Sequence, residues 1–187
     1  MKKAVLITGS ARRNSNTKAL ADSFEKAAKE NDISVERIDT YMLNLGPCHG
    51  CDQCFKNGRG CAYNDDFNKY VYQVMEADAI VISCPVYWYT MPACVKAFID
   101  KFYALYVGGR DFKGKKWALM SCCEADEPET FDGLLFALDK SFELMGAESA
   151  GKILLTGVCE AGDIYNTDGL VQAEKLAAHL AETLYNE

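Results

Sequence analysis

The sequence predicts an α/β domain in which helices cover both faces of one parallel sheet. Short, continuously apolar runs recur along the chain, as expected for parallel strands that are buried on both faces. Segments with apolar residues at helical spacing separate them. This alternation is typical of a single parallel sheet between helices. Because 187 residues suffice for one well-buried domain and are few for two, we expect one domain over residues 1–187.

Five segments have the character of strands. Residues 79–84, AIVISC, are the clearest, because the run is apolar throughout, as in a central strand. Residues 33–39, ISVERID, are the weakest, because their alternation is imperfect. The predicted strands are residues 3–8, 33–39, 79–84, 115–122 and 152–157.

Helices are predicted between and after these strands. Ser15 or Asn16 can cap the first of them. Thr90 is expected to cap a later helix that has Pro92 in its first turn, where proline is tolerated. The predicted helices cover residues 16–30, 66–76, 90 to about 102, 127–145 and 170–184.

Composition and charge exclude several classes of function. The net charge of -7 argues against broad nucleic-acid binding and against adhesion to an anionic membrane, since both need a basic face. The apolar runs 4–7 and 79–91 are too short for a signal-peptide core and for a bilayer span, respectively. We therefore expect a cytoplasmic protein whose nine cysteines are mostly thiols or ligands.

The loop after the first predicted strand, GSARRNSNT, has the character of a phosphate site. In a parallel sheet, ligands bind outside the carboxyl ends of the strands. This loop opens a helix, whose free N–H groups favour an anion. Four side chains can donate to a phosphate monoester and Arg12 can add charge; the donors are Ser10, Ser15, Asn16 and Thr17. The loop lacks the P-loop and G-x-G-x-x-G patterns, and the alternative is a polar loop that only caps a helix.

The segment after the clearest strand, PVYWYT, suits a flat uncharged ring. Its proline and clustered aromatic residues can pack against such a ring and present backbone groups to it. A core aromatic cluster is the alternative. We favour the ring site, because core aromatics usually lie within helices and strands and Pro85–Trp88 follow the strand.

Together, GSARRNSNT, CHGCDQC, CPVYWYTMPACVKAFIDKF and TGVCEAGDI resemble the NAD(P)H-dependent FMN reductase family, in particular its iron–sulfur flavoprotein branch. The resemblance implies a flavodoxin-like three-layer sandwich with strand order 2-1-3-4-5. It also implies a bound FMN and an assembly as a homodimer or homotetramer.

By this resemblance, three loops hold the FMN. The phosphate contacts would be Ser10, Arg12, Ser15, Asn16 and Thr17. The residues bordering the isoalloxazine would be Pro85, Val86, Tyr87 and Trp88. The third loop would contribute Ser121, Cys122 and Cys123, where the family usually has small residues or glycine.

Four cysteines follow the second predicted strand with the spacing C-x2-C-x2-C-x6-C. Bacterial ferredoxins bind [4Fe–4S] clusters with a similar run of thiolates. The cluster ligands would be Cys48, Cys51, Cys54 and Cys61. A structural zinc ranks lower, because it usually uses two separated pairs. The other alternative is a thiol-rich lid over the flavin without a cluster. Either way, the position after a strand places this loop on the flavin's edge of the sheet.

Two functions follow. The first is an enzyme that takes hydride from NAD(P)H through FMN and reduces a quinone, a nitroaromatic, a flavin or a metal ion. It needs no catalytic side chain for hydride transfer, because the flavin carries that chemistry. The second is an electron carrier between redox proteins that uses flavin and cluster. A cysteine-based sensor without flavin is a weaker third, because the phosphate and ring loops count against it. The acceptor and the choice between NADH and NADPH stay open.

Overall fold

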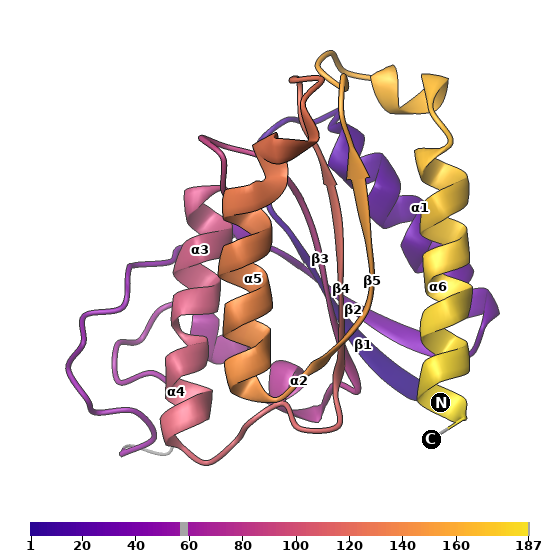
Figure 1. Ribbon diagram of the computed structural model, residues 1–187. Coiled ribbons are helices and arrows are strands. Elements are labelled where there is room, and N and C mark those ends of the chain that lie inside the picture. Colours follow the sequence, from indigo (N-terminus) through magenta and orange to yellow (C-terminus); the bar gives the residue numbers. More distant parts are fainter. Residues whose placement is uncertain (57–59, 187) are drawn as a thin grey trace.

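The computed structural model describes residues 1–56 and 60–186, and its centre is a parallel sheet (Figure 1). Within these residues the sheet has five strands in the order β2-β1-β3-β4-β5, and every neighbouring pair is parallel. The predicted fold class and strand order are therefore confirmed. The strands are β1 (Lys2–Thr8), β2 (Ile33–Asp39), β3 (Ala79–Pro85), β4 (Lys116–Cys122) and β5 (Glu148–Leu155).

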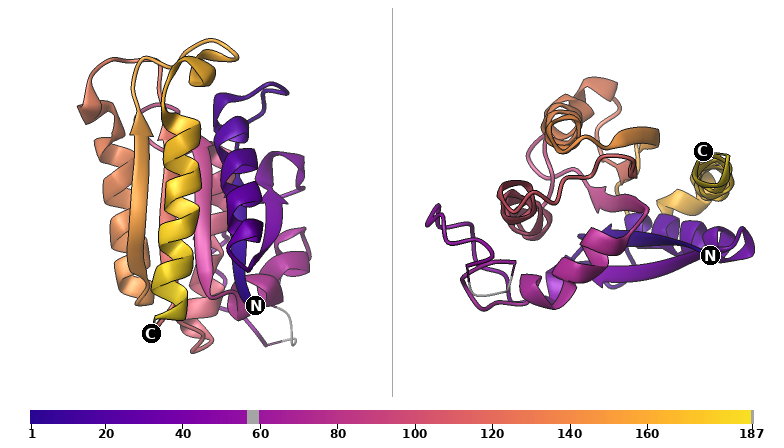
Figure 2. Two further views of the ribbon diagram at one scale, coloured as in Figure 1. Left: turned by 90° about the vertical axis from the view of Figure 1, so that its right-hand side faces the viewer. Right: turned by 90° about the horizontal axis from the view of Figure 1, so that it is seen from below.

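Helices form a layer on each face of the sheet (Figures 1 and 2). One layer consists of α1 (Asn16–Glu30) and α6 (Gly169–Tyr185). The other layer consists of α2 (Phe67–Glu76), α3 (Ala93–Asp100), α4 (Phe102–Val107) and α5 (Asp132–Met145). Across residues 1–56 and 60–186, none of the helices combines the length and the apolar character that a membrane span requires.

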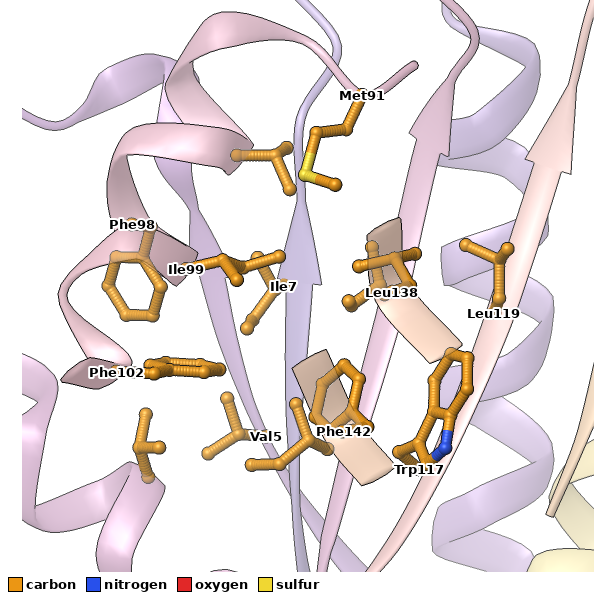
Figure 3. Packing of buried hydrophobic residues seen from close by; sticks show 14 of the residues in the cluster. Val5, Ile7, Met91, Phe98, Ile99, Phe102, Trp117, Leu119, Leu138 and Phe142 are labelled. Atoms are coloured by element: carbon orange, nitrogen blue, oxygen red, sulfur yellow. The ribbon is translucent and has the colours of Figure 1, made fainter. Parts of the chain in front are cut away.

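Two hydrophobic cores lie on the two faces of the sheet. Successive side chains of a strand point to opposite faces, so β1 contributes Leu6 to the core under α1 and α6 and Ile7 to the core under α3 and α5. Aromatic rings are concentrated in the second core, where they pack among aliphatic side chains (Figure 3). There the Phe142 ring stacks on Trp117 at a centroid distance of 4.6 Å and meets the edge of Phe102 at 6.4 Å. These contacts hold α4 and α5 against β4.

The structure corrects the predicted limits of β5. The strand begins at Glu148 and ends at Leu155, whereas the sequence predicts residues 152–157. As the edge strand it exposes part of its length, so Glu148 and Ser149 carry no apolar signal. A register irregularity opposite Trp117 and Ala118 further breaks the strand pattern.

Two helix starts also differ from prediction. Pro92, and not Thr90, occupies the N-cap of α3, because Thr90 pairs with Tyr87 in a tight turn. The helix predicted from residue 127 begins as a 3₁₀ turn over Pro128–Phe131, and α5 follows at Asp132. By contrast, α1 has its predicted bounds, and Ser15 caps it by accepting a hydrogen bond from Lys18 N.

Replacing Phe142 with Ala should lower the free energy of unfolding by about 3–5 kcal/mol, because it removes a buried ring that links α4, α5 and β4. The matched control is Phe136→Ala on the same helix, whose side chain is 70% exposed. That change should stay within about 0.5 kcal/mol. Urea denaturation of both variants gives the two values, and equal losses would contradict this assignment of the core.

Candidate functional site

A cavity of about 220 Å³ lies where the carboxyl ends of the strands meet. It brings together most of the residues predicted to contact flavin, from three loops that are far apart in the sequence. Those that line it are Ser10, Arg12, Ser15, Asn16, Thr17, Pro85, Val86, Tyr87, Cys122 and Cys123. Glu124, Val158 and Cys159 complete the lining. This cavity is named the flavin cavity below.

The phosphate loop, residues 9–15, reaches the cavity by passing close to α3, and the glycine at its first position makes this close approach possible. A Cβ atom on Gly9 would lie 2.1 Å from a methyl group of Val95, so only glycine lets the loop pass so close to α3. Ser15 then caps α1, and its hydroxyl lies 2.9 Å from that of Thr17. The start of α1 thus brings backbone N–H groups and two hydroxyls to the cavity, an arrangement that favours an anion.

The side chain of Asn16 ties the phosphate loop to the loop after β5. Its Oδ1 accepts hydrogen bonds from Gly162 N at 2.9 Å and Ile164 N at 3.4 Å. Its Nδ2 donates to the carbonyl of Glu160 at 2.8 Å. Asn16 lines the cavity, and these bonds give it a structural role that sequence reasoning missed.

Arg12 makes the second link between the same two loops. Its guanidinium donates to the carbonyl of Cys159 at 2.8 Å. The position of Val158 and Cys159 after the fifth strand was the signal that could have placed them in the cavity, although neither is among the predicted flavin contacts.

The ring loop continues from β3 as a tight turn. Val86 N donates to the carbonyl of Cys122 at 3.1 Å, and Tyr87 and Thr90 exchange two backbone hydrogen bonds of 2.8 and 3.0 Å. Between them, Trp88 and Tyr89 have φ angles of 48° and 63°. Such left-handed backbone is uncommon for residues other than glycine. Tyr87 lines the cavity, whereas Trp88 is 94% exposed and does not.

The third loop brings two of its three predicted residues to the cavity. Ser121 is fully buried and donates to the carbonyl of Cys84 at 2.7 Å, so it supports the ring loop from behind. Burial raises the pKa of Cys122 to about 12 and also raises the pKa of Cys123. Both thiols are therefore protonated at neutral pH, and they present small uncharged surfaces to the cavity.

The cysteine segment is residues 43–66, and its described residues, 43–56 and 60–66, do not stay at the flavin's edge of the sheet. None of its described residues lines the flavin cavity. The Phe55 ring packs against Gly108 and lies 4.3 Å from the Arg110 guanidinium, beyond the carboxyl end of α4 at Val107. Because α4 runs away from the carboxyl edge, the prediction that this segment lies beside the flavin, or covers it as a lid, is wrong for a single chain.

Two anchors fix the far end of the cysteine segment. Asn68 on α2 bonds to both backbone groups of Cys61, at 2.8 and 3.0 Å. The carboxylate of Asp65 pairs with the ammonium of Lys101, which is almost fully buried at the junction of α3 and α4. The segment is therefore held by specific tertiary contacts with α2, α3 and α4.

The four thiols of the segment lie near one another without forming a ready-made metal site. Burial raises the pKa of Cys54, and the neighbouring Cys61, Cys51 and Cys48 raise it further. A bound cation would relieve this mutual repulsion of thiolates. Among the described residues, however, no three His, Cys, Asp or Glu side chains are placed to hold a metal ion. Four thiols are suitable donors for an iron–sulfur cluster, but the described side chains are not arranged around a common metal position. The cluster therefore stays a prediction.

Comparison with known proteins gives the family. The model of the family "NADPH-dependent FMN reductase" matches residues 2–127. An iron–sulfur flavoprotein of Archaeoglobus fulgidus is 29% identical over 184 residues, which are 96% of this chain and 79% of the relative. One of Methanocaldococcus jannaschii is 29% identical over 188 residues, covering 97% of each chain.

Among solved structures, the NAD(P)H:quinone oxidoreductase of Methanothermobacter marburgensis superposes with a TM-score of 0.77, covering 95% of each chain. At 17% identity this likeness shows the fold alone. The family match covers the phosphate loop, the ring loop and the start of the third loop, all of which line the flavin cavity. The chain therefore belongs to the NADPH-dependent FMN reductase family, and it is an oxidoreductase.

Proposed function

We propose that this oxidoreductase binds FMN in the flavin cavity and passes electrons from NAD(P)H to a small acceptor such as a quinone, a nitroaromatic, a flavin or a metal ion. The observation that carries the proposal is the joining of a phosphate cradle and a ring site in one cavity at the carboxyl edge. FMN has a phosphate at one end and a flat ring at the other, and this cavity has a complementary surface for each.

The phosphate end of the cavity supplies hydrogen-bond donors and positive charge. The start of α1 favours an anion through its free N–H groups. The hydroxyls of Ser10, Ser15 and Thr17 line the cavity beside it. The Arg12 guanidinium adds charge while its bond to the Cys159 carbonyl limits its movement. We assign these residues to the FMN phosphate, and Asn16 to the position of the loop.

Apart from the carboxylate of Glu124, the ring end is uncharged. Pro85, Val86 and Tyr87 form one part of the lining, and the protonated thiols of Cys122 and Cys123 form another. When bound, FMN accepts a hydride equivalent and delivers electrons onward, so the chemistry of the step belongs to the cofactor. The protein orients the ring and leaves one face accessible. We therefore assign no catalytic acid or base.

An electron carrier between redox proteins is the second candidate. The iron–sulfur flavoproteins among the relatives and the electrostatically coupled thiols of the cysteine segment favour it. The described part of the segment lies against α4, from Tyr103 in its first turn to Gly108 at its end, and it does not line the flavin cavity. We propose that any cluster on Cys48, Cys51, Cys54 and Cys61 serves a flavin in a neighbouring copy.

A homodimer or homotetramer is part of the same proposal. The outer surface of α4 and α5 exposes several large apolar side chains that one copy could cover on another. They are Tyr103, Tyr106, Phe136 and Leu144.

All nine cysteines are free thiols, which supports a reducing, cytoplasmic location. Since both cores share one sheet, we also propose that residues 1–187 form a single domain.

Replacing Ser10 with Ala should weaken FMN binding about tenfold, because it removes one hydrogen bond to a charged phosphate. NADPH oxidation with a quinone acceptor should fall at low FMN and recover with excess FMN. Ser34→Ala, an exposed change on β2, is the matched control and should change neither. Flavin-fluorescence titration and steady-state rates measure both. An electron carrier without reductase activity would bind FMN equally well but oxidise no NADPH or NADH.

Replacing Trp88 with Asn should leave the protein as stable as before or raise its free energy of unfolding by up to about 1 kcal/mol. Asn tolerates the left-handed backbone of this position, and the exposed indole has no core contacts to lose. If the indole borders the flavin, the fluorescence of bound FMN should change in both Trp88→Asn and Trp88→Phe, because neither variant keeps the indole. A clear loss of stability in both apo and FMN-bound protein would show that the indole packs against the chain instead.

Replacing Cys54 with Ala should remove most of the iron from anaerobically purified protein, if the cysteine segment holds a cluster. Cys84→Ala should remove none, because Cys84 lies in the core of β3. FMN should remain bound in both variants, since the flavin cavity contains neither residue. Iron, acid-labile sulfide and flavin assays give the three values. Wild-type protein with stoichiometric FMN and no iron would eliminate the cluster and leave the reductase function intact.

A further inference from the structure

A second cavity, of about 280 Å³, lies on the β2 side of the phosphate loop. It shares Ser10, Arg12 and Thr17 with the flavin cavity, so the two cavities flank the same loop. Its other walls come from the ends of β1 and β2 and from the 3₁₀ turn η1 (Thr40–Met42). None of the groups assigned above to the flavin ring lines it. We call it the β2-side cavity.

Positive charge is concentrated around the β2-side cavity, although the chain carries a net charge of -7. Four cationic side chains and one carboxylate, that of Asp39, line it; the cations are Arg12, Arg13, Lys18 and Arg37. Lys18 and Arg37 pair with Asp22 on α1 at 2.9 and 2.5 Å, and Arg37 also lies 3.5 Å from Glu25. Arg13 has no ion pair within the described part of the chain. Its charge is therefore the one available to attract an anion to this cavity.

A buried hydroxyl in the wall of the same cavity has no hydrogen-bond partner. Thr8 lines the cavity with only 5% of its surface exposed. Within residues 1–56 and 60–186, its Oγ1 is the buried side-chain atom left without a partner. Such groups are rare in folded proteins, because burial without a hydrogen bond is costly. Thr8 lies outside the flavin cavity. A ligand in the β2-side cavity could therefore form the missing hydrogen bond with its hydroxyl, whereas FMN in the flavin cavity could not.

The outer wall of the β2-side cavity is apolar. Tyr41 and Met42 line it with 55% and 75% of their surfaces exposed. A phenol ring and a thioether are suited to covering a flat heterocycle. The volume lies near the lower limit of small-molecule sites, so it suits a phosphate with one nucleoside and not a whole dinucleotide.

We propose that the β2-side cavity binds a phosphorylated adenosine group, its phosphate meeting Arg13 and the Thr8 hydroxyl and its adenine meeting Tyr41. This inference rests on the proposed function, which supplies two sources of such a group. One is the 2′-phosphate end of NADPH, and the other is a 5′-adenylate, either that of NADH or that of FAD as the flavin acceptor. In either case the cavity selects the nucleotide that the enzyme uses.

The test is calorimetric titration of the FMN-saturated protein with 2′-AMP, 5′-AMP, adenosine and inorganic phosphate. Both nucleotides should bind, and adenosine and phosphate should each bind at least about tenfold more weakly than the better nucleotide. Tighter binding of 2′-AMP identifies NADPH as the source. Tighter binding of 5′-AMP identifies a 5′-adenylate, and titration with NADH and with FAD then tells which of the two supplies it. Thr8→Val and Arg13→Gln should each weaken the better nucleotide about tenfold.

The variants have built-in controls. Thr8→Val keeps the shape of the side chain and removes a hydroxyl that no protein group uses, so thermal stability should not fall. Lys26→Gln removes the same charge as Arg13→Gln from an exposed position of α1 outside the cavity, and it should leave nucleotide binding unchanged. FMN affinity should be unchanged in all three variants, because Thr8, Arg13 and Lys26 lie outside the flavin cavity.

Several results would overturn the inference. They are no binding of either nucleotide at millimolar concentration, equal binding of inorganic phosphate, unchanged affinities in Thr8→Val and Arg13→Gln, or loss of FMN in these variants. The last would show that the cavity belongs to the FMN phosphate. A wild-type protein that binds no FMN would refute the proposed function instead, and the same titrations on that protein would still decide the β2-side cavity.

Discussion

The side-chain amide of Asn16 holds the candidate site together. The phosphate loop follows β1 in the middle of the sheet, whereas residues 160–164 follow the edge strand β5. These strands are not neighbours, so no backbone pairing joins their loops. Asn16 makes the connection with three hydrogen bonds, and Arg12 adds a fourth through Cys159. The packing of α1 against α6 in one core brings the two loops within reach of each other. The shape of the flavin cavity therefore depends on a polar bridge supported by a hydrophobic layer.

The opposite layer explains why the cysteine segment leaves the site. α3 and α4 run from the carboxyl edge towards the other end of the sheet, and the segment follows them. Asp65 meets the buried ammonium of Lys101 at the junction of the two helices, and Phe55 packs beyond the end of α4. Removing one partner of a buried ion pair is strongly destabilising, so Lys101 keeps the segment on this path. This path keeps the described residues of the segment out of the flavin cavity of the same chain.

Periodicity and the carboxyl-edge rule account for most of what the sequence predicted. The continuous apolar run of β3 and the amphipathic pattern of α1 identify buried elements, and the sheet rule then assigns their loops to one edge. Both signals are local, and both were confirmed. The first residues of β5 were not predicted, because they are exposed on an edge strand and lack the apolar pattern of a buried one. The path of the cysteine segment could not be predicted, because it depends on an ion pair between Asp65 and Lys101. These residues are far apart in the sequence, and no local pattern indicates that they pair. The same holds for Asn16, whose type suited a phosphate donor and a bridge between loops equally well.

Burial divides the cysteines into two chemical kinds. Cys122 and Cys123 lie in the wall of the flavin cavity, where burial raises each pKa and keeps the thiol neutral. Neutral thiols add no charge beside a redox-active ring, so the positive charge near the flavin cavity comes from Arg12 and the start of α1. Cys48 and Cys51, in contrast, are exposed and lie close enough to Cys54 to raise its pKa. A thiol in such a group gains from a cation, whereas a buried one does not. The same residue type therefore supplies a neutral wall in the flavin cavity and a group of mutually repelling thiols in the cysteine segment.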